Sequence, residues 1–592
     1  MQIHISICDL NRKLQQALRS GPHGQKANYV VRTTFATRYC ACVRLQFMAC
    51  TASTIRRLAF AFVAFGGLGT GPACAENSYD AAKLEAEGAV IGEIVLDKAN
   101  VFDLNDPAEN NAFYRLANLI HVVTKDKVIR KQLLFESGDT YSKRLADESE
   151  RVLRQNQYLF DAKITPVHYE NGVVDLTVAT RDLWSLQPEL SLSRSGGENS
   201  TTIGLDESNL LGSGTRVRFL RDEDVDRDQT IFEVSDKHVG NSWVSAVIRY
   251  ADNSDGHSNG MSAVRPFHEL DARWSGGIQL WDDDRREALY ELGNETAEYQ
   301  QEREYYSAFG GWSKGLQGSH ARRWTAGIVY DDNRFVPVMD GSLPAAIPED
   351  RKLVYPFIGF ELVEDEFETS TNRDQISRTE DFMMGKHVSA TLGWSDETFG
   401  ADRDALIYFA RASRGFGSLQ KNALLLSSSI RGRLESGKTA NALLSISTRY
   451  YRTQSEKRLF YTSLSATAGQ ELDLDNPVRL GGDTGLRGYP LRYQNGESKL
   501  LVTAEQRYFT DWYPLRLVRV GAAIFADVGR VWGRSPVGEE RKGWLADVGF
   551  GLRLALTRSS SRKVIHVDVA FPLNGDPTID DVQFLIESRR SF

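Results

Sequence analysis

The sequence predicts an all-β barrel that crosses a membrane, preceded by one small α+β domain. Three observations indicate this: a segment typical of a secretory signal near the N-terminus, alternation of apolar and polar residues from about residue 187 onward, and the absence of cysteine after residue 74. Export of a long chain without cysteine points to the cell envelope and excludes stabilisation by disulfides in the exported part.

The first 75 of the 592 residues differ in composition from the rest. They hold nine Lys or Arg, one acid and all five cysteines, which leaves a net charge of −16 on the remainder. Arg56 and Arg57 precede an apolar run, Leu58–Leu68, and an Ala-Cys-Ala sequence ends at Ala75. A basic start, an apolar core and a small-residue cleavage site are the three parts of a secretory signal. The apolar core is too short for a helix that spans a bilayer.

We interpret residues 48–75 as the signal peptide, beginning at Met48 and cleaved after Ala75. Residues 1–47 are then a non-native upstream extension that forms no structure. A lipoprotein signal that uses Cys74 is the weaker alternative, because the residues before this cysteine do not follow the usual pattern.

The sequence pattern of residues 88–184 predicts the α+β domain. Asn171-Gly172 between two alternating runs is a strong signal for a β-hairpin, and the preceding region has apolar residues at helical spacing. The expected elements are a strand at Ile91–Val95, helices at Lys127–Phe135 and Ser142–Asn156, an extra helix within Asn105–Thr124, and hairpin strands at Ile164–Tyr169 and Val173–Ala179.

Residues 187–592 show period-two alternation in runs of about 9–11 residues, the length that tilted membrane-spanning strands require. One face of these runs is apolar and the other carries Arg, Gly or acids, which fits lipid outside and water inside. Polar stretches such as Asp365–Asp381 separate the runs as connections. A soluble β-sandwich or propeller has the same period and is the alternative. Aromatic residues near strand ends predict an interfacial girdle: Trp243, Tyr250, Tyr450, Tyr451, Trp512 and Tyr513.

A glycine-dense loop with one arginine, Leu480–Tyr489, precedes a strand whose polar face carries a single acid, Asp527. A buried arginine needs a partner, because an unpaired buried charge costs several kcal/mol. We therefore expect Arg487 to tie a plug-like loop to the inside of the barrel wall.

Several segments together resemble one known family. They are Val128–Gly138, Glu148–Arg154, Asn209–Gly214, Leu486–Tyr489, Glu505–Arg507 and Phe525–Gly529. In this order they resemble the BamA/TamA superfamily of outer-membrane assembly and translocation barrels. The resemblance covers nearly all of residues 88–592, and its last two motifs are the specific ones. The chain differs in having one POTRA domain, and Arg590 stands in the final strand where an apolar residue is often found.

The resemblance implies a POTRA domain at 88–184 and a barrel of sixteen antiparallel strands at 187–592. It implies that Arg487 pairs with Asp527 in the lumen, with Glu505 as a second possible partner. The loop glycines Gly481, Gly482, Gly485 and Gly488 are expected to let the loop turn with positive φ and sit close to the wall. The implied site residues are the latch Arg487, Gly488, Tyr489, Asp527 and Glu505, the strand motif Phe525 and Gly529, the loop glycines Gly481, Gly482 and Gly485, and the C-terminal strand signal Phe584 and Phe592.

The function that the resemblance implies is non-enzymatic insertion or translocation of polypeptide at the bacterial outer membrane. The POTRA domain in the periplasm would capture a client by strand addition, most readily at Ile91–Val95. The barrel would open at a seam near Leu190 and Phe584. Expected partners are an unfolded or extended polypeptide, outer-membrane lipid, and periplasmic chaperones or accessory lipoproteins. No nucleic acid, cofactor or metal is expected. A passive channel with a structural POTRA domain is the alternative.

Two short motifs suggest enzymes but stand in the wrong context. Gly432–Thr439 matches a phosphate-binding P-loop, which must follow a strand and open a helix. Period-two alternation on both sides predicts a hairpin with its turn at Glu435–Lys438 instead. Gly311–Gly315 matches a nucleophile elbow around Ser313, which also requires a following helix. A barrel-embedded hydrolase that uses Ser313 is the third hypothesis.

Overall fold

The computed structural model describes residues 79–338, 347–535 and 543–589. The expected extension 1–47, the signal peptide 48–75 and Phe592 lie outside these residues. No helix in the described part of the chain is long and apolar enough to span a membrane.

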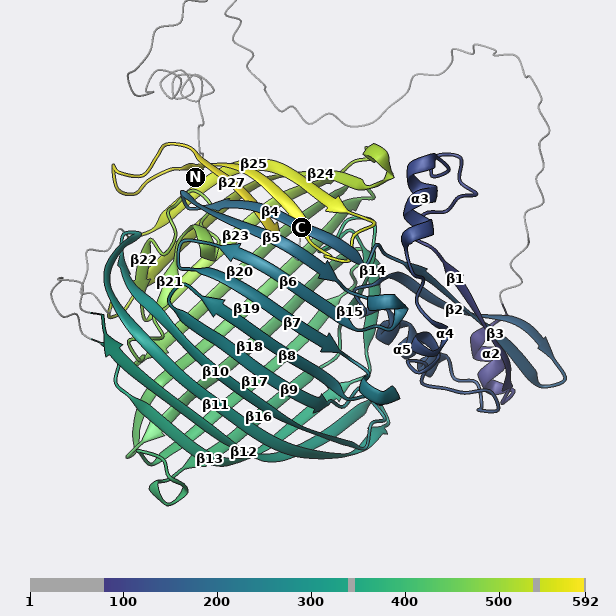
Figure 1. The fold of residues 1–592 in the computed structure, drawn as a ribbon, viewed down its shortest axis with the longest axis horizontal. Helices are drawn as coiled ribbons and strands as arrows, with labels where there is room; N and C mark the ends of the chain where they lie inside the picture. Colours follow the sequence, from purple (N-terminus) through teal and green to yellow (C-terminus); the bar gives the residue numbers. More distant parts are fainter. Residues whose placement is uncertain (1–78, 339–346, 536–542, 590–592) are drawn as a thin grey trace, which may run out of the picture. The chain divides into compact units, whose positions relative to one another are not determined.

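The N-terminal part is a three-stranded sheet covered by helices (Figure 1). The strand order is β1-β3-β2, with β1 parallel and β2 antiparallel to the central strand β3. Asn171 and Gly172 have φ of 51° and 81° in the hairpin turn, as their sequence predicts. The elements are α2 (Ala81–Ala86), β1 (Val90–Ala99), α3 (Ala112–Ile120), α4 (Asp126–Arg130), α5 (Lys143–Arg154), β2 (Leu159–Glu170) and β3 (Val173–Asp182).

These elements agree with the sequence analysis except for α4, which ends at Arg130 rather than at Phe135. The chain leaves the helix where the Gln132 side chain donates back to the carbonyl of Val128 at 2.8 Å. The extra helix expected within 105–124 is α3. The core between sheet and helices contains Ile129, Leu153, Leu159, Leu176 and Val178, all buried.

The rest of the described chain contains a closed barrel of twenty strands, in which every neighbouring pair is antiparallel. Its strands are β4 (Leu186–Ser195), β5 (Glu198–Glu207), β6 (Arg216–Glu223), β7 (Asp228–Asp236), β8 (Ser245–Asn253), β9 (Gly256–Arg265), β10 (Trp274–Glu291), β11 (Asn294–Gln317), β12 (His320–Pro337), β13 (Arg351–Glu364), β16 (His387–Ser395), β17 (Ala405–Gly417), β18 (Asn422–Glu435), β19 (Lys438–Ser455), β20 (Arg458–Gln470), β23 (Ser498–Phe509), β24 (Val518–Trp532), β25 (Leu545–Leu556), β26 (Val564–Pro572) and β27 (Gln583–Arg589).

The barrel class is therefore as expected, but sixteen strands is wrong. That number came from the resemblance, because period-two alternation identifies strands without counting them. Strands β4 to β9 are only 8–10 residues long. Their short turns fit more strands into the same length than the resemblance implied.

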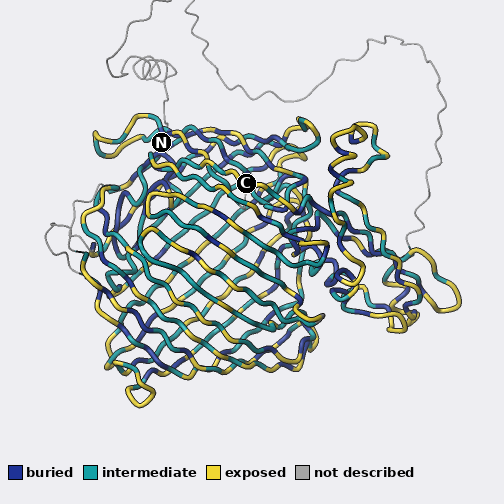
Figure 2. Tube along the Cα trace, viewed as in Figure 1, coloured by how far each residue is buried: buried dark blue, intermediate teal, exposed yellow. Residues whose placement is uncertain are grey.

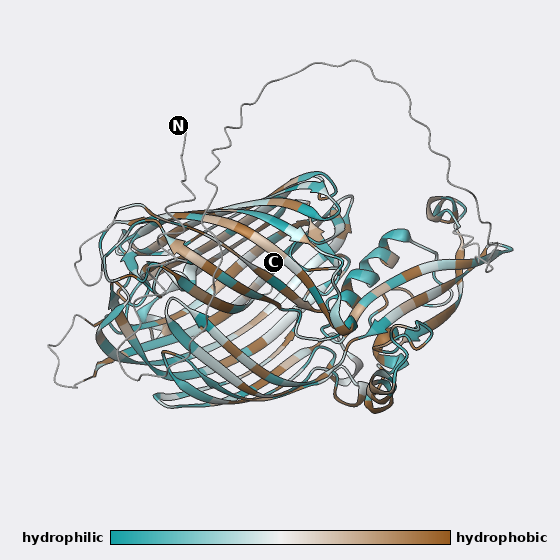
Figure 3. Cartoon of the chain, turned by 90° about the horizontal axis from the view of Figure 1, so that it is seen from above, coloured by the Kyte–Doolittle hydropathy of each residue, from teal (hydrophilic) through white to brown (hydrophobic). Residues whose placement is uncertain are grey.

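Burial alternates along the barrel strands, and hydropathy alternates with it (Figures 2 and 3). Large apolar side chains face outward, among them Leu190 at 72%, Ile358 at 60% and Phe584 at 60% exposure. Trp512 and Tyr250 are exposed as a girdle requires. Tyr451 is not: it is buried, and its hydroxyl donates to the Asp374 carboxylate, so its assignment to the girdle is wrong.

Two small hairpins lie outside the barrel ladder. One pairs β14 (Phe367–Thr371) with β15 (Thr379–Met383), between barrel strands β13 and β16. The other pairs β21 (Val478–Leu480) with β22 (Gln494–Gly496), between β20 and β23. The first replaces the plain polar connection that the sequence predicted at 365–381.

Candidate functional site in the barrel lumen

Arg487, at the tip of the loop between β21 and β22, is bound to acids on the barrel strands. Its Nε and Nη2 donate to the two Asp527 carboxylate oxygens at 2.7 and 3.0 Å. Its Nη1 donates to Glu505 at 2.8 Å. The guanidinium lies 3.4 Å from the centre of the Phe525 ring. Because Arg487, Asp527 and Glu505 are at most 5% exposed, each depends on the others for charge compensation.

The residues that follow Arg487 extend the attachment to β25. The backbone N–H of Gly488 donates to the Asp547 carboxylate at 3.0 Å. The Tyr489 hydroxyl donates to the carbonyl of Ala546 at 2.9 Å and accepts the Ala546 N–H at 3.0 Å. The loop tip is therefore held by both main-chain and side-chain groups.

Of the two properties expected of the loop glycines, the positive φ is wrong for three of them, whereas all four lie close to neighbouring atoms. Gly485 alone among the four has a positive φ, 111°. A Cβ on Gly481 would lie 2.5 Å from the Pro490 carbonyl oxygen, and one on Gly482 2.6 Å from that of Tyr489. A Cβ on Gly488 would lie 2.7 Å from the Asp547 side chain. Gly529 on β24 likewise leaves room for Leu480, at 3.1 Å.

The far flank of the same loop contacts the first strands of the barrel. Arg492 forms an ion pair with Asp226 in the β6–β7 turn, with Nη1 to Oδ1 at 2.7 Å, and lies over the Tyr290 ring at 4.5 Å. A Cβ on Gly196, in the β4–β5 turn, would lie 2.3 Å from the backbone N of Leu491. The loop thus joins the last strands to the first strands from inside the lumen.

The closing seam lies between β27 and β4. In the described residues it has a single pair of facing residues, Ile586 and Arg194. By contrast, β4 pairs with β5 along its whole length, and β26 pairs with β27 from Ala570–Gln583 to Val564–Arg589. Leu190 and Phe584, which the sequence placed near the seam, lie on β4 and β27 and face outward.

Residues 365–386, which contain β14 and β15, form a second inward-folded segment that the sequence analysis missed. Its Asp374 accepts hydrogen bonds from Arg449 and Tyr451 of β19, both at 2.7 Å. Ile376, Phe382 and Met384 are buried against residues of the barrel wall. Apolar residues within an otherwise charged stretch were the available signal.

The two inward segments enter from opposite ends of the barrel and meet at Arg507 on β23. Nη1 of Arg507 donates to the carbonyl of Arg373 at 2.8 Å. Its Nε donates to Glu505 at 2.8 Å, and Glu505 in turn accepts from Arg487. A continuous line of hydrogen bonds therefore links the hairpin to the tip of the loop.

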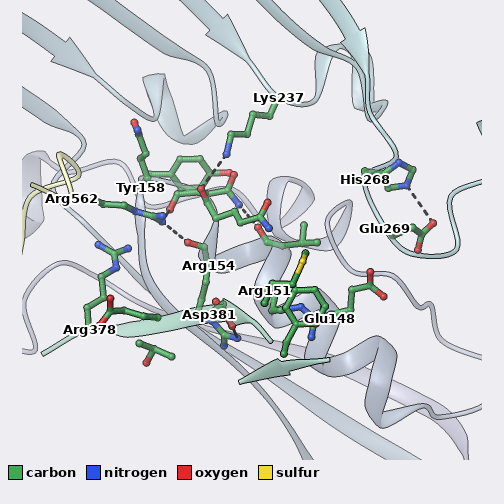
Figure 4. A pocket seen from close by; sticks show the side chains of 18 of the residues that line it. Glu148, Arg151, Arg154, Tyr158, Lys237, His268, Glu269, Arg378, Asp381 and Arg562 are labelled. Carbon is green, nitrogen blue, oxygen red and sulfur yellow. Dashed lines mark hydrogen bonds and ion pairs between the residues drawn. The ribbon is translucent and has the colours of Figure 1, made fainter. Parts of the chain in front are cut away.

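The hairpin is also tied to the N-terminal part of the chain. Arg154 at the end of α5 donates through Nε and Nη2 to both carboxylate oxygens of Asp381, at 2.9 and 2.6 Å. The Arg151 guanidinium lies 4.0 Å from the centre of the Phe367 ring. These contacts border a cavity of about 780 Å³ (Figure 4).

Both acidic and basic side chains line this cavity, and the pKa values of several of them are shifted. Burial, followed by repulsion from Arg562 and Arg216, lowers the pKa of Lys237 to about 8. Burial lowers the pKa of Arg378 to about 10, although Asp161 and Glu380 oppose it. Burial, together with Asp374, raises the pKa of Glu380 to about 8 against three backbone hydrogen bonds. The cavity is thus a charged junction in which removal from water is the largest effect.

The two enzyme-like motifs lie in barrel hairpins. Gly432–Thr439 runs from β18 to β19 through a two-residue turn at Ser436 and Gly437, as predicted, with φ of 49° and 77°. Ser313 is 1% exposed, and its hydroxyl donates to the carbonyl of Arg322 at 2.9 Å. The described residues contain no group of three His, Cys, Asp or Glu arranged to hold a metal ion.

No protein-family model and no curated protein matches the chain. Among solved structures, it is similar to the crystal structure of BamA from Haemophilus ducreyi lacking POTRA domains 1–3, with 13% identity and a TM-score of 0.34 over 83% of this chain and 84% of that chain. CdiB from Acinetobacter baumannii gives 14% identity and a TM-score of 0.42 over 84% and 74% of the two chains. CdiB from Escherichia coli gives 12% and 0.41 over 84% and 75%. One of these proteins, BamA, gives its name to the BamA/TamA superfamily, which the sequence motifs resemble.

Proposed function

We propose that this protein is a bacterial outer-membrane barrel that inserts or translocates polypeptide clients. The observation that carries the proposal is the seam between β27 and β4, where the residues up to Arg589 form one facing pair instead of the long ladders found between the other described strands. A closed barrel offers no free strand edge, so a client strand can be templated only where the ladder is easily opened. A weak seam with an intact wall on both sides supplies that edge.

The outward apolar band supports the membrane location. Side chains such as Ile358, Phe550 and Phe584 are 55–60% exposed, which is unfavourable in water and favourable in lipid. In this proposal the domain at 88–184, which precedes the first barrel strand, lies in the periplasm.

We assign this domain as a POTRA domain that binds an extended client by strand addition. Both outer strands of its sheet are edges, but β2 carries Pro166 next to a register shift, a combination that blunts an edge. The first part of β1 already forms backbone hydrogen bonds with residues 138–141. The segment of β1 from Val95 onward is therefore the proposed docking edge, adjoining the expected Ile91–Val95.

The Arg487 cluster serves as the latch of the inward-folded loop in this mechanism. It fixes the loop to β23, β24 and β25, while the Arg492 flank reaches the first strands. Seam opening then requires only the weaker flank to separate. The protein is proposed to act without covalent chemistry, because Ser313 is buried and bonded to a backbone carbonyl. Periplasmic chaperones or accessory lipoproteins are proposed as further partners.

Deletion of residues 79–184 tests the function, with quantitative proteomics of the outer membrane and the culture medium. We expect loss of many barrel proteins if the protein inserts them, or of one large secreted protein if it serves dedicated secretion. A barrel that assembles normally, conducts ions unchanged and leaves both proteomes intact would instead establish a passive channel with a structural POTRA domain.

A further inference from the structure

Helix α3 carries its large apolar side chains on the outside. Phe113, Leu116, Leu119 and Ile120 are 65%, 55%, 80% and 61% exposed. The spacing of Phe113, Leu116 and Ile120 places them along one face of the helix. A contiguous apolar face of this kind marks an interaction surface rather than ordinary surface variation.

The opposite face of α3 is firmly packed, so the orientation of the helix is fixed. Tyr114 and Ala117 are buried, and the Tyr114 ring stacks on Phe102 at 4.3 Å between centroids. The Asn118 side chain accepts the backbone N–H of Phe102 at 3.1 Å and donates to its carbonyl at 2.8 Å. The apolar side chains therefore point outward while the polar amide points inward.

The packed face of α3 contacts the barrel, next to a turn whose apolar side chains are exposed like those of the helix. The Tyr114 hydroxyl donates to the carbonyl of Leu515, in the turn between β23 and β24. In that turn Trp512 is 65% and Leu515 74% exposed. Exposed tryptophan at a strand end is typical of the boundary between lipid and water. Helix α3 thus lies at the level of this boundary.

The charges around α3 fit an anionic lipid surface. The helix sequence, Ala112–Ile120, contains Arg115 and no acid. Arg519 lies next to the adjoining turn, with its guanidinium 4.0 Å from the centre of the Tyr513 ring, whereas Arg516 in the turn pairs with Asp106 at 3.9 Å. Basic residues beside an apolar helical face favour binding to anionic headgroups.

We propose that α3 lies in the surface of the lipid bilayer, with Phe113, Leu116, Leu119 and Ile120 inserted among the phospholipids of the periplasmic leaflet. This inference rests on the proposed membrane location of the barrel. The helix is a second membrane contact, which holds the N-terminal domain beside the wall near β24.

Three single-cysteine variants of residues 76–592 test the inference, each carrying a fluorophore in vesicles that contain phosphatidylglycerol. The exported residues contain no cysteine of their own. Leu119→Cys is the test position. Ile358→Cys, at 60% exposure on the barrel wall, is the lipid control, and Val167→Cys, at 47% exposure on β2, is the water control.

We expect nitroxide groups on the acyl chains to quench Leu119→Cys as strongly as Ile358→Cys, and iodide in the water to quench only Val167→Cys. Iodide quenching of Leu119→Cys with normal lipid quenching of Ile358→Cys overturns the inference alone. Protection of Leu119→Cys from both quenchers also overturns it, since a protein partner then covers the helix. Loss of lipid quenching at Ile358→Cys overturns the proposed membrane location and the inference with it.

Discussion

The wall that carries the latch and the seam that closes the barrel are built in opposite ways. Strands β23 and β24 are paired from Ser498–Trp532 to Phe509–Gly521, and the Arg487 cluster lies on their inner face. Strands β27 and β4 share one facing pair within the part of the chain that the structure describes. The buried ion pairs of Arg487 therefore lie where the ladder of β23 and β24 is already complete. The latch does not seal the seam but anchors a loop whose other flank reaches across it.

The loop between β21 and β22 is attached to the barrel in two different ways. The tip is bound by buried, mutually dependent charges, whereas the flank is bound by Arg492 and Asp226, which retain 14% and 33% side-chain exposure. Breaking a partly exposed ion pair costs far less than removing one member of a buried cluster, which leaves the other charges unpaired. The seam can therefore open while the loop stays fixed to the late strands.

Arg487→Ala is expected to have the largest effect. It leaves Asp527 and Glu505 buried without their shared cation, which costs ~3–5 kcal/mol. We expect a lower urea midpoint and a reduced heat-shifted band in a gel. Arg492→Ala is the matched control and should cost ~1 kcal/mol or less. Equal losses in the two variants would remove the distinction between tip and flank.

A disulfide across the seam should abolish client handling without lowering stability. Arg194 and Ile586 face each other in antiparallel strands, at a Cα separation of about 4.5–5.5 Å, within the range of a disulfide. We expect the double variant Arg194→Cys, Ile586→Cys to lose insertion or secretion of its clients on oxidation and to regain it on reduction.

The control for this disulfide shares one of its cysteines. Val567 and Ile586 face each other between β26 and β27, where the ladder is complete. Oxidised Val567→Cys with Ile586→Cys should remain active. Full activity of the seam disulfide would mean that the barrel works without opening there.

Replacing residues 367–383 by a short turn should give a moderate effect on the lumen and little on the wall. The segment packs Ile376 and Phe382 against the inside of the barrel wall, yet the ladder between β13 and β16 does not include it. We expect higher ion conductance in planar bilayers, with the heat-shifted gel band retained. Asp381→Asn, which weakens only the pair with Arg154, serves as the milder comparison. Unchanged conductance on replacement would show that the segment does not obstruct the lumen.

The pairing of Arg487 with acids could be predicted from sequence, because a glycine-rich loop and a strand with one acid leave few ways to compensate a buried charge. Both reasons for the glycines could be predicted, but not which of them holds at each position, since close approach and positive φ select the same residue. The hairpin at 365–386 was missed because its acids and arginines resemble a solvated connection. Its charges are instead paired with residues distant in sequence, such as Asp374 with Arg449. The seam was placed correctly on β4 and β27, but its weakness depends on register, which alternation does not determine.

A change of pH should have the smallest effect and should act on the hairpin rather than on the latch. Burial and Asp374 raise the pKa of Glu380 to about 8 from its ordinary value of 4.5 in an open chain. The folded hairpin therefore keeps a proton that the released hairpin loses. Its stability is fully present below the lower value and declines as the pH rises through the higher one. We expect conductance to increase between about pH 5 and about pH 9.

Glu380→Gln should remove this pH dependence, because the amide cannot titrate. The Arg487 guanidinium also keeps its charge throughout this range, so the latch should hold while the hairpin loosens. Conductance that rises equally in wild type and Glu380→Gln would assign the pH dependence to another group. A heat-shifted band lost in parallel with the conductance change would mean that the hairpin and the latch respond as one unit, coupled through Arg507 and Glu505.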